Sequence, residues 1–398
     1  MTRRVTLCRS LELPDPLRLA RYARAPELGP RLLFFSGGTA LAGLSRRLTA
    51  YTHHSVHLIT PFDSGGSSAV LRRAFNMLAV GDLRNRLMAL ADQSVQGNPE
   101  IVELFAFRFP KPQPPEALRR ELDQMIRGRH HLVSRVPDPM RKIIRNHLGF
   151  FRRRMPPDFD LAGASVGNLV LTGGYLNNRR HIDPVVFMFS KLAEVRGLVR
   201  PVVTADLHLG AELADGRVVL GQHLLTGKVT APLTSPLERL FLNHGLAERQ
   251  EARARIRAKV RQIIGQAELI VFPMGSFYTS LLATLLPEGV GRAVAAAPCP
   301  KVFVPNVLGD PEMLGLNLTR AVTRLLAALQ ADAPRAPVGQ LLNLVMVDSD
   351  QAAYPGGPPD LAEIRGLGVE VVDLPLVTPE AAPLLDPGRV ADALLSLV

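Results

Sequence analysis

The chain has 398 residues, 47% of them hydrophobic and 21% charged, which is the composition of a folded globular protein with one large domain or two. Its two cysteines, Cys8 and Cys299, lie far apart, which excludes a disulfide framework and a zinc site and favours a reducing, cytoplasmic compartment. The N-terminal residues lack the apolar core of a signal peptide. The most apolar window, 269–287, contains Pro273 and Gly275 and indicates strand, loop and buried helix, so we expect no membrane contact.

The formal net charge of +11 is concentrated in one segment. From Arg108 to Arg154 there are 13 Lys and Arg against 4 Asp and Glu, a net charge of +9. Arginine suits contacts with phosphates and carboxylates, so this segment is either a solvated helical hairpin or a surface for an acidic or phosphorylated partner. The chain has no Trp and only 5% aromatic residues, so a stacking platform for nucleic acid is not expected.

Strands and helices alternate along the chain. In the first half we predict an extended leader over 1–30, strands over 31–35 and 56–60, helices over 40–48, 69–75 and 81–95, and a basic helical insertion over 110–157. The second half is predicted to hold helices over 163–176, 236–266, 316–329 and 388–397, strands over 269–272, 301–305, 341–347 and 369–374, and a β insertion over 200–230. This order predicts an α/β fold over 31–398, with a doubly wound (Rossmann-like), mostly parallel sheet.

Two predicted strands end in glycine-serine loops that run into helices. These loops are Ser36-Gly37-Gly38-Thr39 and Gly275-Ser276-Phe277-Tyr278-Thr279-Ser280. Such loops expose backbone N–H groups at a helix N-terminus, where the helix dipole favours an anion. Each loop alone is also compatible with an ordinary strand-to-helix turn, and the first is not a Walker loop because no Lys-Ser/Thr pair follows its glycines.

A third loop, Asp63-Ser64-Gly65-Gly66-Ser67-Ser68, combines a carboxylate, two glycines and hydroxyl side chains. A carboxylate at a strand end can hold Mg²⁺, while the glycine N–H groups and the two hydroxyls donate to phosphate oxygens. Arg72, in the next turn of the helix, is placed to cover the same anion. The alternative is that Asp63 or Ser67 caps the helix, and both roles can hold at once.

A fourth segment, Gly81-Asp82-Leu83-Arg84-Asn85, places an acid at the start of a helix. Asp82 is read as an N-cap, and Arg84 and Asn85 are candidates to face a ligand. The sequence shows no pattern typical of a Ser-His-Asp or Cys-His catalytic arrangement.

These segments together resemble the CofD-like superfamily, which includes the 2-phospho-L-lactate transferase family, and they are closest to its YvcK-type nucleotide-sugar-binding branch. The resemblance rests on FFSGGTAL (34–41), DSGGSSAVLR (63–72), VGDLRNRLMALAD (80–92), ASVGNLVL (164–171), ELIVFPMGSFYTSLLATLLPEGV (268–290) and PKVFVPNVLGDP (300–311). The chain departs from the family pattern at Ser64, where the family has a second aspartate, and at Ala40, where it has a glycine. It also has Gly309-Asp310-Pro311-Glu312 in place of T-Q-P-x-E.

The resemblance implies a homodimer and a nucleotide or nucleotide-sugar ligand at the C-terminal edge of the sheet. The implied nucleotide- and phosphate-binding residues are Gly37, Gly38, Thr39, Gly65, Gly66, Ser67, Ser68, Asp82, Asn85, Ser165, Asn168, Gly275, Ser276, Tyr278 and Thr279. In the transferase branch a phosphorylated group passes from a nucleoside-diphosphate donor to an acceptor hydroxyl, with Asp63 holding Mg²⁺ and Arg72 stabilising the developing charge. The alternative is a non-catalytic regulatory protein that binds a uridine diphosphate sugar.

Overall fold

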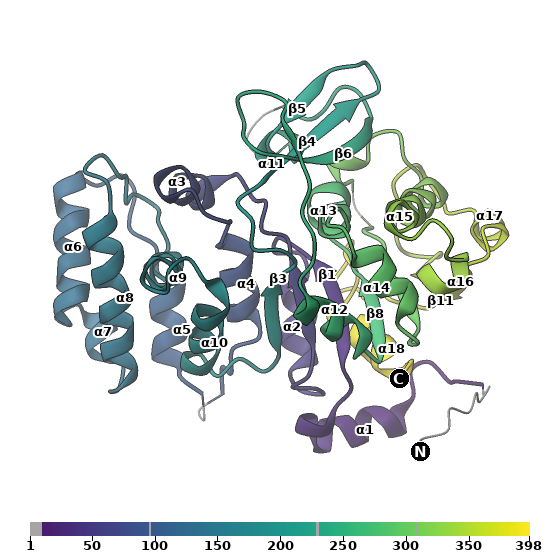
Figure 1. The fold of residues 1–398 in the computed structure, drawn as a ribbon. Helices are drawn as coiled ribbons and strands as arrows, with labels where there is room; N and C mark the ends of the chain where they lie inside the picture. Colours follow the sequence, from purple (N-terminus) through teal and green to yellow (C-terminus); the bar gives the residue numbers. More distant parts are fainter. Residues whose placement is uncertain (1–9, 95–96, 228–230, 308) are drawn as a thin grey trace.

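The centre of the fold is a seven-stranded parallel sheet. The computed structural model describes residues 10–94, 97–227, 231–307 and 309–398. From edge to edge the strands are β11 (Glu370–Asp373), β10 (Leu344–Val347), β9 (Lys301–Phe303), β8 (Leu269–Phe272), β1 (Leu32–Ser36), β2 (Val56–Ile59) and β3 (Leu198–Pro201) (Figure 1). Every neighbouring pair is parallel, which confirms the predicted doubly wound sheet.

The central strands β1 and β8 are buried along their whole length. Strands that helices cover on both faces have continuous apolar runs instead of an alternating pattern, and LLFF and LIVF are such runs. Pairing sets Leu33 opposite both Val56 and Ile270, so the three strands share one register at the middle of the sheet.

Two groups of helices cover the sheet (Figure 1). Helices α2 (Ala42–Leu48), α4 (Gly81–Ala89) and α18 (Pro387–Ser396) pack in one group, and α12 (Ala258–Gly265), α14 (Val290–Ala296) and α15 (Leu318–Asp332) in the other. Shorter helical elements are α13 (Ala283–Leu285), α16 (Val338–Leu341), α17 (Leu361–Gly366), η1 (Pro26–Leu28), η2 (Phe277–Leu282) and η3 (Pro311–Met313). The strand order reverses between β1 and β8. Strands β2 and β3 follow on one side of this point, and β9, β10 and β11 follow on the other.

A second, antiparallel sheet lies beside helix α3 (Gly66–Phe75). Its strands are β5 (Val218–Leu220), β4 (His208–Leu213), β6 (Leu237–Asn243) and β7 (Glu251–Ala252), and α11 (Gln222–Leu225) follows β5. It therefore extends beyond the predicted β insertion over 200–230. The predicted helix over 236–266 is wrong in its first part, because β6 pairs with β4 and Arg239 forms ion pairs across the strands with Glu212 and Glu251.

Six helices form a separate part of the molecule on the other side of β3 (Figure 1). They are α5 (Pro99–Ala106), α6 (Pro115–Arg127), α7 (His131–Ser134), α8 (Met140–Arg154), α9 (Val166–Asn177) and α10 (Ile182–Leu192). Residues 110–157 are thus helical as predicted. Helix α6 buries Leu118, Leu122 and Met125 and ends at Gly128, whose φ of +76° suits glycine. Among the described residues, no helix has both the length and the apolarity needed to cross a bilayer.

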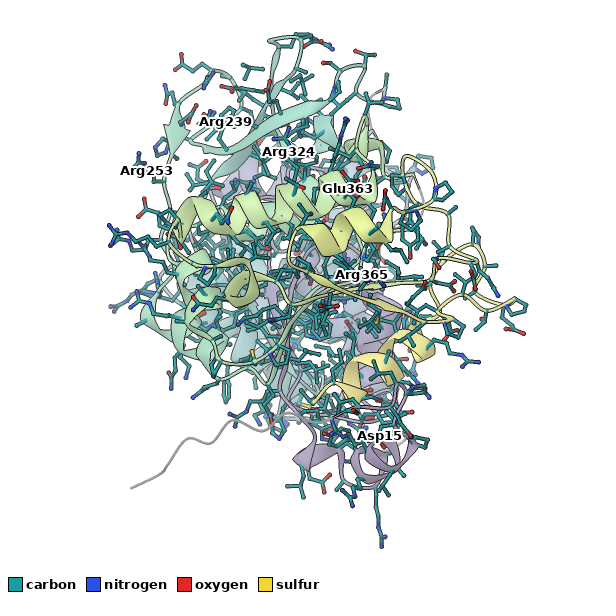
Figure 2. All side chains as sticks on the ribbon, turned by 90° about the vertical axis from the view of Figure 1, so that its right-hand side faces the viewer. Asp15, Arg239, Arg253, Arg324, Glu363 and Arg365 are labelled. Carbon is teal, nitrogen blue, oxygen red and sulfur yellow. The ribbon has the colours of Figure 1, made fainter. Side chains whose placement is uncertain are left out.

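The N-terminal segment is partly helical instead of extended. Helix α1 (Pro16–Arg24) begins at Asp15, whose side chain accepts the N–H groups of its first turn. Asp15 N–H also donates to Ser396 Oγ at 2.8 Å, which ties the segment to α18. Figure 2 shows Asp15 at the end of the molecule opposite Arg239 of β6 and Arg253, which follows β7. Residues 1–9, with Cys8 and the start of the predicted leader, lie outside the described residues.

Candidate functional site

The loops after β1 and β8 meet where the strand order reverses. A Cβ atom built on Gly275 would lie 3.7 Å from Ala40 Cβ, and one built on Gly38 would lie 3.7 Å from Ser280 Oγ. Ligands of doubly wound sheets bind at this place, outside the carboxyl ends of the strands. The topology therefore brings together two loops that are more than half the chain apart.

Because Gly37 has no side chain, the end of β2 and the start of α4 pack closely against the loop after β1. A Cβ atom on Gly37 would lie 2.5 Å from Thr60 Cγ2 and 3.2 Å from Asp82 Oδ2, so only glycine fits between the end of β2 and the start of α4. Gly38 has a φ of +60° and is half-buried, while Thr39 is exposed. Asn85 is half-buried on α4.

The carboxylate of Asp63 lies in the same place. Its Oδ1 accepts the N–H of Gly65 at 3.0 Å, but Gly65 is the N-cap residue and α3 has no side-chain cap, so the predicted capping of this helix by Asp63 or Ser67 is wrong. Asp63 Oδ2 lies 3.4 Å from the position that a Cβ atom on Gly81 would take, and Ser68 Oγ lies 2.5 Å from that position. Asp63 and Ser68 thus both pack against Gly81 at the start of α4. The residue after Gly81 is Asp82, which packs against Gly37. The described residues contain no cluster of three or more His, Cys, Asp and Glu side chains that could hold a metal.

The N-termini of α3 and α9 are joined by a side-chain hydrogen bond. Asn168 Nδ2 donates to Ser67 Oγ at 2.9 Å, and neither helix has a side-chain cap. Arg84 donates to Asn168 Oδ1 at 3.4 Å. Burial, with a smaller effect from the nearby Arg108, lowers the pKa of Arg84 to about 10. Two helix dipoles and a buried guanidinium therefore create a positive potential around Ser67 and Asn168.

The loop after β8 differs from its prediction. The backbone N–H of Phe277 donates to Asp310 Oδ2 at 2.7 Å, so a carboxylate already occupies the start of η2. Tyr278 donates its hydroxyl to Leu237 O at 3.1 Å, and Thr279 donates its hydroxyl to Glu312. These contacts turn both hydroxyls into the interior and do not support direct ligand contact by Tyr278 and Thr279. Gly275 and Ser276 stay half-buried at the sheet edge.

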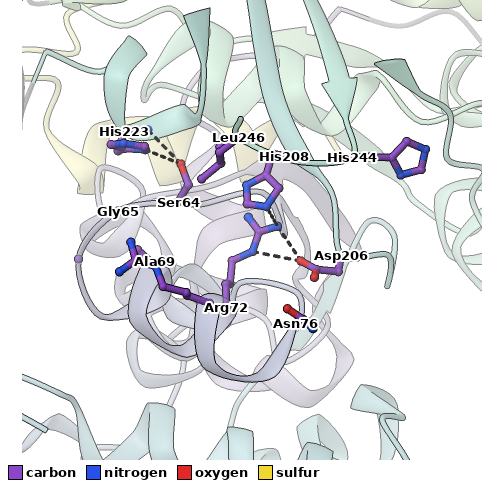
Figure 3. A pocket seen from close by; sticks show the side chains of 12 residues that line it. Ser64, Gly65, Ala69, Arg72, Asn76, Asp206, His208, His223, His244 and Leu246 are labelled. Carbon is purple, nitrogen blue, oxygen red and sulfur yellow. Dashed lines mark hydrogen bonds and ion pairs between the residues drawn. The ribbon is translucent and has the colours of Figure 1, made fainter. Parts of the chain in front are cut away.

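Two further predicted residues have internal partners. Ser165 is fully buried and donates its hydroxyl to Phe105 O at 3.2 Å. Arg72 is 4% exposed, and its three guanidinium nitrogens donate to Asp206 and to backbone carbonyls, among them Asp63 O at 3.1 Å (Figure 3). These contacts do not support direct anion binding by Arg72. They indicate a positioning role that holds the loop carrying Asp63.

Sequence reasoning missed the residues that approach these loops from distant segments. Asp206, His208 and His223 all contact the 64–72 region, and no spacing pattern in the sequence links them to it. The acids at 310 and 312 had a signal, because Gly309-Asp310-Pro311-Glu312 departs from the family's T-Q-P-x-E, but that departure does not reveal the helix start that the two acids bind.

Fold and site together define a doubly wound α/β protein with loops suited to an anion at its switch point. The family model described as 2-phospho-L-lactate transferase CofD matches residues 32–374. The chain belongs to this family.

Curated relatives carry a different name. The gluconeogenesis factor of Bacillus subtilis is 30% identical over 283 residues, which cover 71% of this chain and 69% of that protein. The putative gluconeogenesis factor of Nostoc is 30% identical over 286 residues, and the match spans about half of that relative, 48%. A solved structure of a UPF0052 family protein from Bacillus halodurans has a TM-score of 0.68 at 22% identity, covers 92% of this chain and 99% of that one, and shows the same fold.

Proposed function

We propose that the chain binds a nucleoside-diphosphate ligand at the C-terminal edge of the sheet and transfers a phosphorylated group from it to an acceptor hydroxyl. The observation that carries this proposal is the junction of α3 and α9 beside Arg84. Among the described residues, the Arg84 side chain has one hydrogen bond, of 3.4 Å, although it is only 8% exposed. Burying this charge beside one long hydrogen bond is costly; Asp82 offsets only part of that cost, because the pKa of Arg84 stays lowered, and an anionic ligand would offset more of it.

The proposed roles follow the positions of the loops. Backbone N–H groups of Gly37, Gly38 and Gly66, with the hydroxyls of Ser67 and Ser68, would bind the diphosphate, whereas the Gly65 N–H already donates to Asp63. Asp63 would hold Mg²⁺, with Asp82 close by, and one or two carboxylates plus phosphate oxygens is the usual magnesium donor set. The residues present fit that ion, which would supply positive charge at the diphosphate. Arg72 would act as a positioning residue for the Asp63 loop.

The proposed transfer needs little chemistry from the protein. The acceptor oxygen forms a bond to the phosphorus of the transferred group, the bond from that phosphorus to the oxygen of the leaving nucleoside monophosphate breaks, and the hydroxyl proton passes to water. Alignment of the two oxygens and stabilisation of the charge on the leaving group supply most of the rate in such reactions. Arg84 and the N-termini of α3 and α9 would stabilise that charge.

A second candidate is a non-catalytic protein that binds a uridine diphosphate sugar and acts in regulation. It is favoured by the names of the relatives, several of which are gluconeogenesis factors at 27–30% identity. Homodimerisation and an acidic or phosphorylated partner for the basic insertion are further proposals. Ion pairs of Arg141 with Asp138 and of Arg152 with Asp123 offset part of the insertion's charge.

Ligand titration separates these candidates. Thermal shifts with GDP, GTP and UDP-sugars, with and without Mg²⁺, report binding by mass action. We expect a Mg²⁺-dependent shift that falls in Asp63→Asn and Arg84→Gln and persists in the control Arg153→Gln, an exposed arginine of α8. Release of mononucleotide when an acceptor is added supports transfer, and binding without release supports regulation. No shift with any of these ligands would refute nucleotide binding.

A further inference from the structure

A cavity of about 510 Å³ opens on the other face of α3, between this helix and the small antiparallel sheet (Figure 3). Gly65, Ala69 and Arg73 line it, whereas Ser67 and Ser68 face Asn168 and Gly81. The cavity therefore adjoins the proposed diphosphate site on the opposite face of α3, and Gly65 and Gly66 lie between the two.

One wall of the cavity is rigidly built. Arg72 Nη2 donates to Asp206 Oδ1 at 2.7 Å and to His208 Nε2 at 3.1 Å. The charges of Arg72 and Asp206 offset each other. Burial and, to a smaller extent, Arg72 lower the pKa of His208 to about 4, so this ring is neutral near pH 7.

The opposite wall carries a serine-histidine pair. Ser64 is 4% exposed, its Oγ lies 2.8 Å from His223 Nδ1, and it accepts the backbone N–H of His223 at 3.3 Å. Nδ1 is therefore engaged, and no described residue hydrogen-bonds Nε2. The serine that replaces the family's second aspartate thus fixes an imidazole at the rim of the cavity.

The remaining polar lining favours an anion. Arg73, His223 and His244 offer nitrogen donors, and Asp206 is the single carboxylate among the described lining residues. Its charge is already offset by Arg72. Arginine and imidazole donors are the usual partners of phosphate and carboxylate groups.

We propose that this cavity is a second ligand site, which binds the phosphate or carboxylate group of a small molecule through Arg73 and His223, with His244 on the far side of the same cavity. The cavity lies next to the proposed metal carboxylate. A Cβ atom on Gly65 would lie 3.5 Å from Asp63 Oδ1 and 3.6 Å from His223 Cβ, so the two residues flank one glycine. The bound group belongs either to a separate second substrate or to the distal part of the nucleotide ligand.

Inorganic phosphate is the probe for this site. It is titrated into the full chain at constant ionic strength while the imidazole signals are followed by NMR, assigned with His223→Gln and His244→Gln. We expect saturable movement of the His223 and His244 signals and none for His181, which is exposed before α10. Arg73→Gln should weaken phosphate binding about tenfold, because it removes a charge-assisted hydrogen bond. Arg153→Gln should leave it unchanged.

Signals that do not saturate, or that move equally for His181, would overturn the proposal, as would an unchanged affinity in Arg73→Gln. A second titration with saturating GDP and Mg²⁺ identifies the source of the group. A persistent response indicates a separate second substrate, and a response abolished by GDP indicates the nucleotide's own distal part. A phosphate response in a chain that binds no nucleotide would refute the proposed function and leave this inference standing.

Discussion

Glu312 is bonded twice to Thr279: its carboxylate accepts the Thr279 backbone N–H at 2.8 Å and the Thr279 hydroxyl. It also accepts the Tyr278 N–H at 2.9 Å. A carboxylate from 33 residues further along the chain therefore occupies the helix start at which the sequence predicts a phosphate. Side-chain oxygens of Glu312 and Asp310 accept the N–H groups of that helix start, so the protein uses these donors internally.

This buried acid predicts a pH-dependent stability. Burial, with a further contribution from Asp310, raises the pKa of Glu312 to about 8 from its ordinary 4.5. Between these values the folded state binds a proton that the unfolded state has lost, so stability falls as pH rises, by at most about 1.4 kcal/mol per pH unit. In Glu312→Gln we expect urea unfolding to show a flatter pH dependence in this window. Glu363→Gln, an exposed acid on α17, is the control, and equal slopes in all three proteins would contradict the prediction.

Adjacent arginines on α3 should differ in their contribution to stability. Arg72→Gln removes the ion pair with Asp206 and leaves several carbonyls without donors, so we expect a loss of about 2–4 kcal/mol in the free energy of unfolding. Arg73→Gln changes an exposed side chain and should cost less than about 0.5 kcal/mol. Denaturant unfolding measures both. Similar values for the two variants would show that Arg72 does not hold the loop.

Two helical glycines should respond differently to alanine. A Cβ atom on Gly265 in α12 meets nothing within 4 Å, so Gly265→Ala should stabilise the protein by about 0.5–1 kcal/mol through helix propensity. A Cβ atom on Gly81 would lie 2.5 Å from Ser68 Oγ, so Gly81→Ala should lose that gain and displace the Ser68 hydroxyl. We expect a smaller nucleotide-induced thermal shift in Gly81→Ala alone. An equal stabilisation by both substitutions would argue against close packing at Ser68.

A carboxylate at position 168 should compete with the ligand. In Asn168→Asp the new charge faces Arg84 and two helix N-termini, so we expect the melting temperature without ligand to be retained. The thermal shift with GDP and Mg²⁺ should disappear, because the carboxylate takes the position of the anion. Asn168→Ala is the comparison: it loses the hydrogen bond to Ser67 and should melt earlier. A normal ligand-induced shift in Asn168→Asp would mean that the phosphate binds elsewhere.

Local patterns predicted the strands well where burial is continuous. LIVF over 269–272 is a strand with the predicted bounds, and the loops at Gly37 and Asp63 do converge. The helix predicted over 236–266 was wrong in its first part, because β6 depends on pairing with β4, which comes from another part of the chain, whereas its last part holds α12. The role of Arg72 was not predictable either, since Asp206 reaches it across 134 residues.

The sequence by itself determined the alternation of strands and helices, the glycines at strand ends and the acids and hydroxyls beside them. These depend on backbone conformation and on apolar runs, which act over a few residues. Tertiary structure alone decided which loop donors remain available to a ligand and which are used internally. Asp310 and Glu312 satisfy the start of η2, whereas the starts of α3 and α9 have no side-chain cap. The reason is that a buried polar group must find a partner, and the partner's distance in sequence is irrelevant once the chain has folded.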